Sequence, residues 1–170
     1  ETIQKDHICK LVIASESRFE NLKEKVEDTA VKIVNELNYS GVMGIEMFLK
    51  GEDILVNELA PRVHNSGHYT IEGCYTSQFE NHIRAILDLP LGNTDMLCKN
   101  AVMINIIGER NGEAKLSRAG RVFSKDKVYL HIYGKKETKK GRKMGHITVL
   151  GEDLNDTINT ANQARNDIDI

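Results

Sequence analysis

The chain has 170 residues, a net charge of −2 and 40% hydrophobic residues, which suits one globular domain or two small ones. It contains no apolar run near the roughly 18 residues of a membrane span and no targeting pattern, so we expect a soluble cytoplasmic protein without a membrane partner. The near-neutral charge and 5% aromatic content also argue against a nucleic-acid binder.

The first part of the chain predicts a strand followed by a long helix. The apolar run at 8–14 is typical of a strand. Residues 17–20 fit the capping-box pattern that begins a helix. Apolar residues then recur at steps of three and four, which predicts an amphipathic helix to about Asn38, ended by Gly41. The apolar positions of this helix are Phe19, Leu22, Val26, Ala30, Ile33 and Leu37.

The next elements are a hairpin and a second helix. Two short apolar runs at 45–49 and 54–60 flank a polar segment and predict a β-hairpin. Pro61 ends the second strand, because proline cannot donate to a ladder. Residues 77–80 form a second capping box, and the helix that follows ends before Pro90.

The register of the hairpin decides whether its two glutamates meet, and two registers are open. In the first, Leu49 faces Ile54, and the carboxylates of Glu46 and Glu58 point to opposite faces. In the second, the turn takes one more residue and Glu46 lies directly across from Glu58. Like charges so placed repel unless a hard cation lies between them, and Asn57 adds an oxygen of the type that Mg²⁺ accepts. The alternative is a pair of acids on the solvent face of an amphipathic hairpin.

The second half of the chain reads mainly as β structure. Apolar runs predict strands at 101–107, 128–133 and 146–150. Residues 152–164 predict a final helix, whereas 113–127 fit no element. Because 91–95 resemble a boundary, we expect an α+β fold with two domains, 1–95 and 96–170.

The densest polar cluster is the loop at 62–68. His64 and His68 have a spacing that a helical zinc site would use, but the residues between them are poor helix formers. A plain surface loop is one interpretation. The other is an anion pocket, in which Arg62 offers a fork of donors, Asn65 adds a neutral donor and His64 can relay a proton near neutral pH.

A basic run occupies 135–143, between two predicted strands. Such a run is usually a solvated loop. Gly141 and Gly145 would fix its bends, however, and this makes it a candidate phosphate clamp. Nucleic acid is a weaker candidate for its ligand.

Five motifs together resemble successive signatures of the N5-carboxyaminoimidazole ribonucleotide synthase family of ATP-grasp enzymes. They are NELAPRVHNSGH at 57–68, SQFE at 77–80, DLPLG at 88–92, VMIN at 102–105 and GRKMGH at 141–146. The resemblance extends over nearly the whole chain but only to the C-terminal portion of that family. It implies the C-terminal half of an ATP-grasp domain followed by a small β-rich C-terminal domain, without the family's N-terminal domain and nucleotide lid.

The resemblance implies a ligase of purine biosynthesis with ATP and Mg²⁺, or Mn²⁺ in its place, as cofactors. Glu46 and Glu58 would hold the metal ions that bridge the ATP phosphates, with Asn57 and Glu58 forming the cofactor-binding pair. Arg62 and His64, together with Asn65, would position bicarbonate and stabilise carboxyphosphate.

The basic run would then bind the second substrate. Lys135, Arg142 and Lys143 are implied to hold the 5′-phosphate of aminoimidazole ribonucleotide, whose amine takes up the carboxyl group. The products would be N5-carboxyaminoimidazole ribonucleotide, ADP and phosphate, and the family suggests a homodimer.

The chain departs from the family pattern at two places. Gln4 stands where the family has a histidine that contacts nucleotide, and His7 stands where it has a glycine. Residues 139–140 are Lys-Lys instead of Arg-Pro.

Two other functions are compatible with the sequence. One is a sibling ATP-grasp enzyme that uses formate in a ribotide transformylation, for which the loop around His64 discriminates. The other is a non-catalytic module that uses the basic run to bind nucleic acid, which would show a steep dependence of affinity on salt.

Overall fold

The computed structural model describes residues 1–170, which form two compact units. One unit contains Glu1–Ser15 and Leu97–Ile170, and the other contains Glu16–Met96. The first fifteen residues, which we expected in the first domain, group with the C-terminal half because β2 (Ile8–Ser15) pairs with β5 (Asn100–Ile107).

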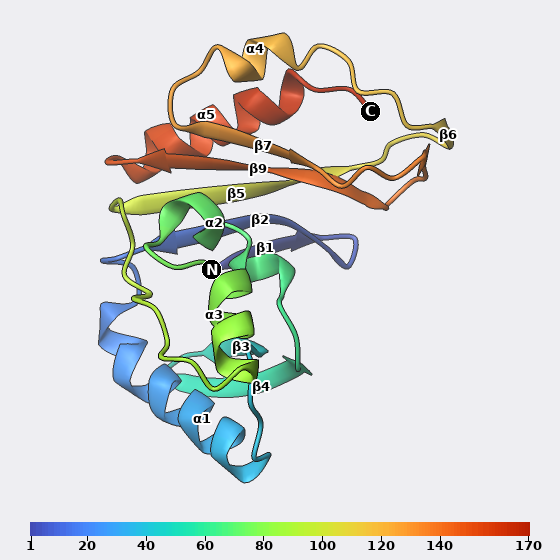
Figure 1. The fold of residues 1–170 in the computed structure, drawn as a ribbon. Helices are drawn as coiled ribbons and strands as arrows, with labels where there is room; N and C mark the ends of the chain where they lie inside the picture. The colour runs from blue at the N-terminus through green and yellow to red at the C-terminus, as the bar shows by residue number, and fades with distance from the viewer. The chain divides into compact units, whose positions relative to one another are not determined.

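A five-stranded antiparallel sheet forms the first unit (Figure 1). Its order is β1-β2-β5-β9-β7, and the strands not yet bounded are β1 (Thr2–Lys5), β9 (Lys143–Gly151) and β7 (Val128–Ile132). The four apolar runs that predicted strands are confirmed as β2, β5, β7 and β9. The β1 strand was not predicted, because three of its four residues are polar and all four are exposed.

Helix α5 (Leu154–Asn166) and the short helix α4 (Gly120–Phe123) cover one face of this sheet (Figure 1). Asp153 caps α5 by accepting a hydrogen bond from the Asp156 amide at 2.9 Å, which confirms the predicted final helix. The main core lies between helices and sheet, and its members include Val102, Ile104, Ile106, Val122, Met144, Ile147, Val149, Ala161 and Ala164.

The region 113–127, for which the sequence predicted no element, holds α4 and the end of a small ribbon. In this ribbon β6 (Gly112–Glu113) pairs with β8 (Glu137–Thr138). Both strands are two residues long, too short for a hydrophobic period to appear in the sequence.

The β1–β2 connection is a two-residue turn, Asp6–His7, because Lys5 pairs with Ile8. Both residues have positive φ, 54° and 59°. A turn with this pair of conformations matches the twist of the strands, but it favours glycine, since a Cβ is crowded in the left-handed region. His7 is therefore strained at the position where the resembling family has glycine.

Replacing His7 by glycine is expected to raise the free energy of unfolding by about 1 kcal/mol, because the left-handed conformation then costs little. Urea denaturation of the chain measures the change. His7→Ala is the matched control: it removes the ring but keeps a Cβ, so it should leave stability near that of the wild type. Equal stabilisation by both variants would show that the ring, and not the backbone, is the source of strain.

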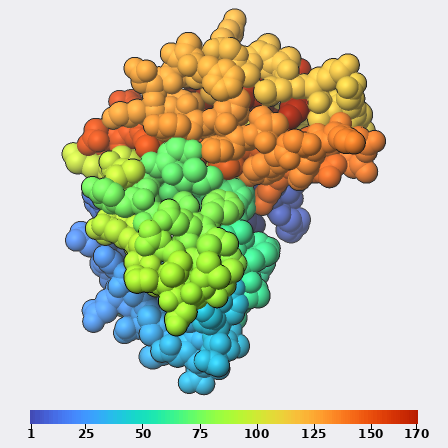
Figure 2. Space-filling model, viewed as in Figure 1, coloured from blue at the N-terminus to red at the C-terminus, as the bar shows by residue number.

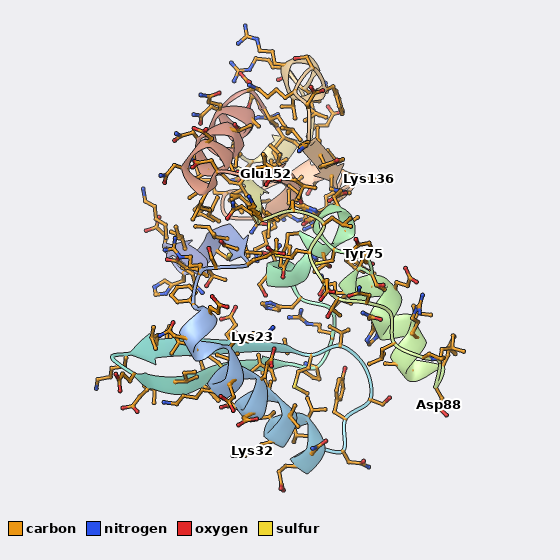
Figure 3. All side chains as sticks on the ribbon, turned by 90° about the vertical axis from the view of Figure 1, so that its left-hand side faces the viewer. Lys23, Lys32, Tyr75, Asp88, Lys136 and Glu152 are labelled. Atoms are coloured by element: carbon orange, nitrogen blue, oxygen red, sulfur yellow. The ribbon has the colours of Figure 1, made fainter.

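The second unit contains three helices and a two-stranded hairpin. Its elements are the 3₁₀ turns η1 (Glu20–Leu22) and η2 (Asn65–Gly67), the helices α1 (Lys23–Glu36), α2 (Thr70–Gly73) and α3 (Gln78–Ile86), and the strands β3 (Gly44–Lys50) and β4 (Asp53–Ala60). Helix α1 lies along the hairpin (Figures 1 and 3), and Lys25 Nζ donates to the Glu52 carbonyl at 2.5 Å.

The two predicted capping boxes have different outcomes. At α3 the prediction is confirmed, since Ser77 Oγ accepts from the Glu80 amide at 3.2 Å. At α1 it is wrong: the helix begins only at Lys23, after the turn η1, and no side chain caps it. Phe19 has a φ of 68°, and this left-handed residue interrupts the helix that the sequence pattern predicted from Ser17.

The second unit leaves much apolar surface uncovered. Helix α1 has no buried residue, and Phe48 of β3 is 58% exposed. In the space-filling view, α3 also lies at the surface (Figure 2), in agreement with the exposure of Ile83 and Ile86. No helix in the chain is long and apolar enough to cross a membrane.

Candidate functional site

The β3–β4 hairpin combines features of both registers. Near its turn Leu49 faces Ile54, as in the first register. Between Glu46 and Met47 the pairing shifts, so that Val56 is opposite Met47 and Asn57 is left as an extra residue. This β-bulge moves Glu58 into the position directly across from Glu46. The expected pairing of the two glutamates is confirmed, although it arises from a bulge and not from a longer turn.

The bulge also sets the contacts of the two carboxylates. Directly paired residues of an antiparallel ladder lie on the same face, so Glu46 and Glu58 are neighbours. The Asn57 amide nitrogen donates to Glu46 Oε2 at 3.4 Å, and the amide oxygen takes no part in this hydrogen bond. Glu46 is largely buried, with 21% of its side chain exposed, whereas Glu58 is exposed. The result is a pair of acids at a bend in the hairpin.

The carboxylates of Glu46 and Glu58 could supply only part of a Mg²⁺ site. The chain has no cluster of three or more residues able to ligate a metal by themselves. Mg²⁺ commonly takes only one or two protein carboxylates and completes its octahedral shell with water and substrate phosphates. Glu46 and Glu58 would supply the carboxylates, and Asn57 an oxygen beside them.

His64 lies beside this acidic pair, in the loop that follows β4. Its Nε2 is 3.8 Å from Glu46 Oε1, too far for a hydrogen bond but close enough for an electrostatic interaction, and only 14% of its side chain is exposed. The Ser66 amide donates to His64 Nδ1 at 3.4 Å, and the Ser66 hydroxyl lies 2.8 Å from the same atom. In the neutral ring Nδ1 accepts, so the proton is on Nε2, toward the carboxylate.

The position of His64 also depends on a glycine in β3. A Cβ added at Gly44 would lie 2.7 Å from both Cβ and Cγ of His64. The close approach of the loop to the strand therefore requires glycine at this position. No sequence pattern indicates this contact, because it joins residues twenty positions apart.

The other two residues of the predicted anion pocket are placed differently. Arg62 is exposed, and its Nη1 donates to the carbonyl of Val63 at 3.0 Å. Asn65 begins the turn η2 and is partly buried. Arg62, His64 and Asn65 thus belong to one short segment that starts immediately after the acidic hairpin.

The predicted phosphate clamp lies in the other unit, between β7 and β9. Lys135 Nζ donates to the Lys143 carbonyl at 2.6 Å and lies 5.7 Å from the centre of the Tyr133 ring. Arg142 Nη1 donates to the Glu137 carbonyl at 2.9 Å. Desolvation, and then the charges of Arg142 and Lys143, lower the pKa of Lys135. Three cations are therefore held close together, in a field that favours an anion.

The backbone of this basic segment is held by hydrogen bonds. The Gly141 amide donates to the Gly108 carbonyl, and the Lys140 amide donates to Asn111 Oδ1. The segment lies at the surface of its unit, where Figure 3 labels Lys136 (Figures 2 and 3). Gly141 makes the predicted bend with a φ of 80°.

Gly145 does not make the second predicted bend. It lies within β9, opposite Ile132, where an added Cβ would meet the His131 carbonyl oxygen at 2.2 Å. Glycine is needed there for the close approach of two strands, and not for a turn.

Two family models match the chain. Residues 1–79 match the ATP-grasp domain, and residues 101–160 match the phosphoribosylaminoimidazole carboxylase C-terminal domain. N5-carboxyaminoimidazole ribonucleotide synthase of Bacillus subtilis is 53% identical over 130 residues, which cover 76% of this chain and 33% of that protein. This chain belongs to the N5-carboxyaminoimidazole ribonucleotide synthase family.

Solved structures of the family have the same fold. The Thermotoga maritima synthetase is 43% identical, with a TM-score of 0.87 over 95% of this chain and 47% of that one. The Aspergillus clavatus synthase, in complex with ADP and 5-aminoimidazole ribonucleotide, is 40% identical, with a TM-score of 0.87 over 97% of this chain and 45% of that one. The chain therefore spans less than half the length of these relatives.

Two residues that shape the loop were not predicted from the sequence of this chain. Ser66 orients the ring of His64, and Gln78 holds the backbone of the same residue. Serine and glutamine are common in polar segments, and Gln78 was seen only as part of a capping box. Their contacts form across turns and between elements, so no sequence spacing predicts them.

Proposed function

We propose that this chain is part of an ATP-dependent ligase that carboxylates 5-aminoimidazole ribonucleotide with bicarbonate, in the de novo synthesis of purines. The observation that carries the proposal is the bulged hairpin, which pairs Glu46 with Glu58 and is followed at once by the loop of Arg62 and His64. Because the chain spans less than half of its relatives, the complete enzyme includes more polypeptide than these 170 residues.

In this proposal Glu46 and Glu58 bind Mg²⁺, with Asn57 beside them. An ion held there would neutralise charge on the phosphates of ATP, which a phosphoryl transfer requires. Mn²⁺ suits the same oxygen donors. The A. clavatus relative was solved with ADP, which supports an adenine nucleotide as the partner of this site.

The loop after the hairpin binds bicarbonate. Arg62 offers a planar fork of donors to an oxyanion, and Asn65 adds a neutral donor. His64 presents its Nε2 proton on the side of Glu46. A bicarbonate oxygen attacks the γ-phosphorus of ATP, so the bond between the β- and γ-phosphates breaks and ADP leaves, giving carboxyphosphate.

The basic segment holds the 5′-phosphate of the ribotide. Lys135, Arg142 and Lys143 supply the positive charge, and the complex of the A. clavatus relative with 5-aminoimidazole ribonucleotide supports this ligand class. The ribotide amine attacks the carboxyphosphate carbon, loses a proton and releases phosphate. By the same family resemblance we propose that the complete enzyme is a cytoplasmic homodimer.

ADP release by the complete enzyme tests this function. We expect full turnover only when ATP, Mg²⁺, bicarbonate and 5-aminoimidazole ribonucleotide are all present, with a large decrease when any one is omitted. Turnover that depends on formate instead of bicarbonate would assign the chain to the sibling transformylase reaction. Absence of ribotide-dependent turnover, together with salt-sensitive binding to random duplex DNA, would favour the nucleic-acid module.

A further inference from the structure

The side chain of Gln78 connects helix α3 to the loop that carries His64. It is buried, with 8% of its surface exposed, although glutamine is normally found at the surface. Its Oε1 accepts from the His64 amide at 2.9 Å, and its Nε2 donates to the His64 carbonyl at 2.8 Å. These two bonds close a ring with the backbone of a single residue, and they fix which end of the Gln78 amide is oxygen and which is nitrogen.

The same amide determines the tautomer of His68. Gln78 Nε2 lies 2.9 Å from His68 Nδ1. Because Nε2 can only donate, Nδ1 must accept, so the proton of the neutral His68 ring is on Nε2. A proton on Nδ1 would bring two donors together. The ring of His68 is also stacked on Phe79, with the centroids 5.5 Å apart.

Neighbouring residues hold Gln78 in place. Its backbone amide donates to Thr70 Oγ1 at 2.9 Å, and that hydroxyl donates to the Gly67 carbonyl at 2.6 Å. A Cβ added at Gly67 would lie 2.7 Å from Gln78 Oε1. The loop is therefore packed directly against the amide group of this glutamine.

We propose that Gln78 is a positioning residue for the bicarbonate step: it fixes the backbone of His64 and sets the ring tautomer of His68, with the proton on Nε2. This role rests on the proposed function. The proposed geometry of His64 and His68, however, concerns only the contacts within the loop and α3. It can be measured without any reaction.

The tautomer is measured by long-range ¹H–¹⁵N correlation spectra of the histidine rings in this chain. In the wild type we expect His68 with Nδ1 unprotonated and Nε2 protonated. In Gln78→Glu a carboxylate replaces the donor, so we expect Nδ1 to become protonated. A wild-type His68 with its proton on Nδ1 would overturn the proposal, and so would a Gln78→Glu spectrum that leaves Nδ1 unprotonated.

The effect of Gln78 on the bicarbonate step is measured in the complete enzyme. We expect Gln78→Glu to raise the KM for bicarbonate by about tenfold or more, since a displaced His64 misplaces the oxyanion, while the KM for ATP changes less than about twofold. Gln163→Glu, which makes the same change at an exposed site on α5, is the matched control and should alter neither constant.

The outcomes separate the two proposals. An unchanged bicarbonate KM in Gln78→Glu, in an enzyme whose wild type requires bicarbonate, would overturn the role of Gln78 alone. A wild type that releases ADP equally well without bicarbonate would contradict the proposed function, and with it the kinetic role of Gln78, whatever the tautomer of His68.

Discussion

Replacing Glu58 by glutamine is expected to abolish Mg²⁺-dependent ATP turnover in the complete enzyme, with a loss of at least about a thousandfold. The side chain keeps its size, but the amide removes one of the two negative charges that the bulge brings together. Metal-bridged phosphates need that charge, because phosphoryl transfer is catalysed mainly by positioning and electrostatics. Steady-state ADP release at saturating Mg²⁺ measures the loss.

The Glu58→Gln change should not destabilise the fold. Glu58 is exposed, and removing one of two neighbouring like charges relieves repulsion, so the melting temperature should stay the same or rise slightly. Glu52→Gln, at an exposed position in the turn of the same hairpin, is the matched control and should keep full activity. Wild-type turnover in Glu58→Gln would contradict the metal assignment.

Replacing Arg142 by alanine is expected to raise the KM for 5-aminoimidazole ribonucleotide by about ten- to a hundredfold. A hydrogen bond to a charged group is worth about 1.5–3 kcal/mol, which corresponds to that range. The affinity for Mg²⁺ and the KM for ATP should not change, since Arg142 lies in the other unit from the acidic hairpin. Initial rates at varied ribotide concentration measure the effect.

Lys136→Ala provides the comparison within the same segment. Lys136 is exposed, whereas Lys135 beside it is partly buried and bonded to the Lys143 carbonyl. We expect the Lys136 variant to lose less than about threefold in affinity, as for a solvated charge. Equal effects at Lys136 and Arg142 would mean that the segment acts through its total charge, and an unchanged KM in Arg142→Ala would mean that it is only a solvated loop.

The sequence predicted the buried strands and α3 well, for a physical reason. The β5 strand is buried at every residue, and its continuous apolar run is typical of a buried strand. Ser77 and Glu80 form a cap that is local in the chain, and local hydrogen bonds can be read from spacing.

The predicted helix is present as α1, but its predicted start at Ser17 was wrong, because the capping-box spacing did not decide where the helix begins. Ser17 had the right spacing to cap a helix, yet the chain turns through Phe19 in a left-handed conformation and the helix begins six residues later, at Lys23. The apolar positions of α1 are not buried in this chain, so hydrophobic period alone could not fix where the helix begins.

The sequence indicated candidate residues in the hairpin and the loop, but not the geometry that the structure gives them. Two simple registers were considered for the hairpin. The strands pair in the first register on the turn side of the bulge at Asn57 and in the second register on the other side. Extra residues of this kind depend on the local twist of the strands and carry no signature in hydrophobic alternation. The contact of Gln78 with His64 joins residues fourteen positions apart, and it becomes visible only when α3 and the loop are folded together.

The most direct test of the proposed reaction traces the carbon atom of bicarbonate into the product. The complete enzyme is supplied with ATP, Mg²⁺, 5-aminoimidazole ribonucleotide and ¹³C-bicarbonate, and the product is followed by ¹³C NMR. We expect a labelled carbamate carbon on the ribotide amine, formed in equal amount to ADP and phosphate. A ribotide that takes up label from ¹³C-formate and none from bicarbonate would contradict it.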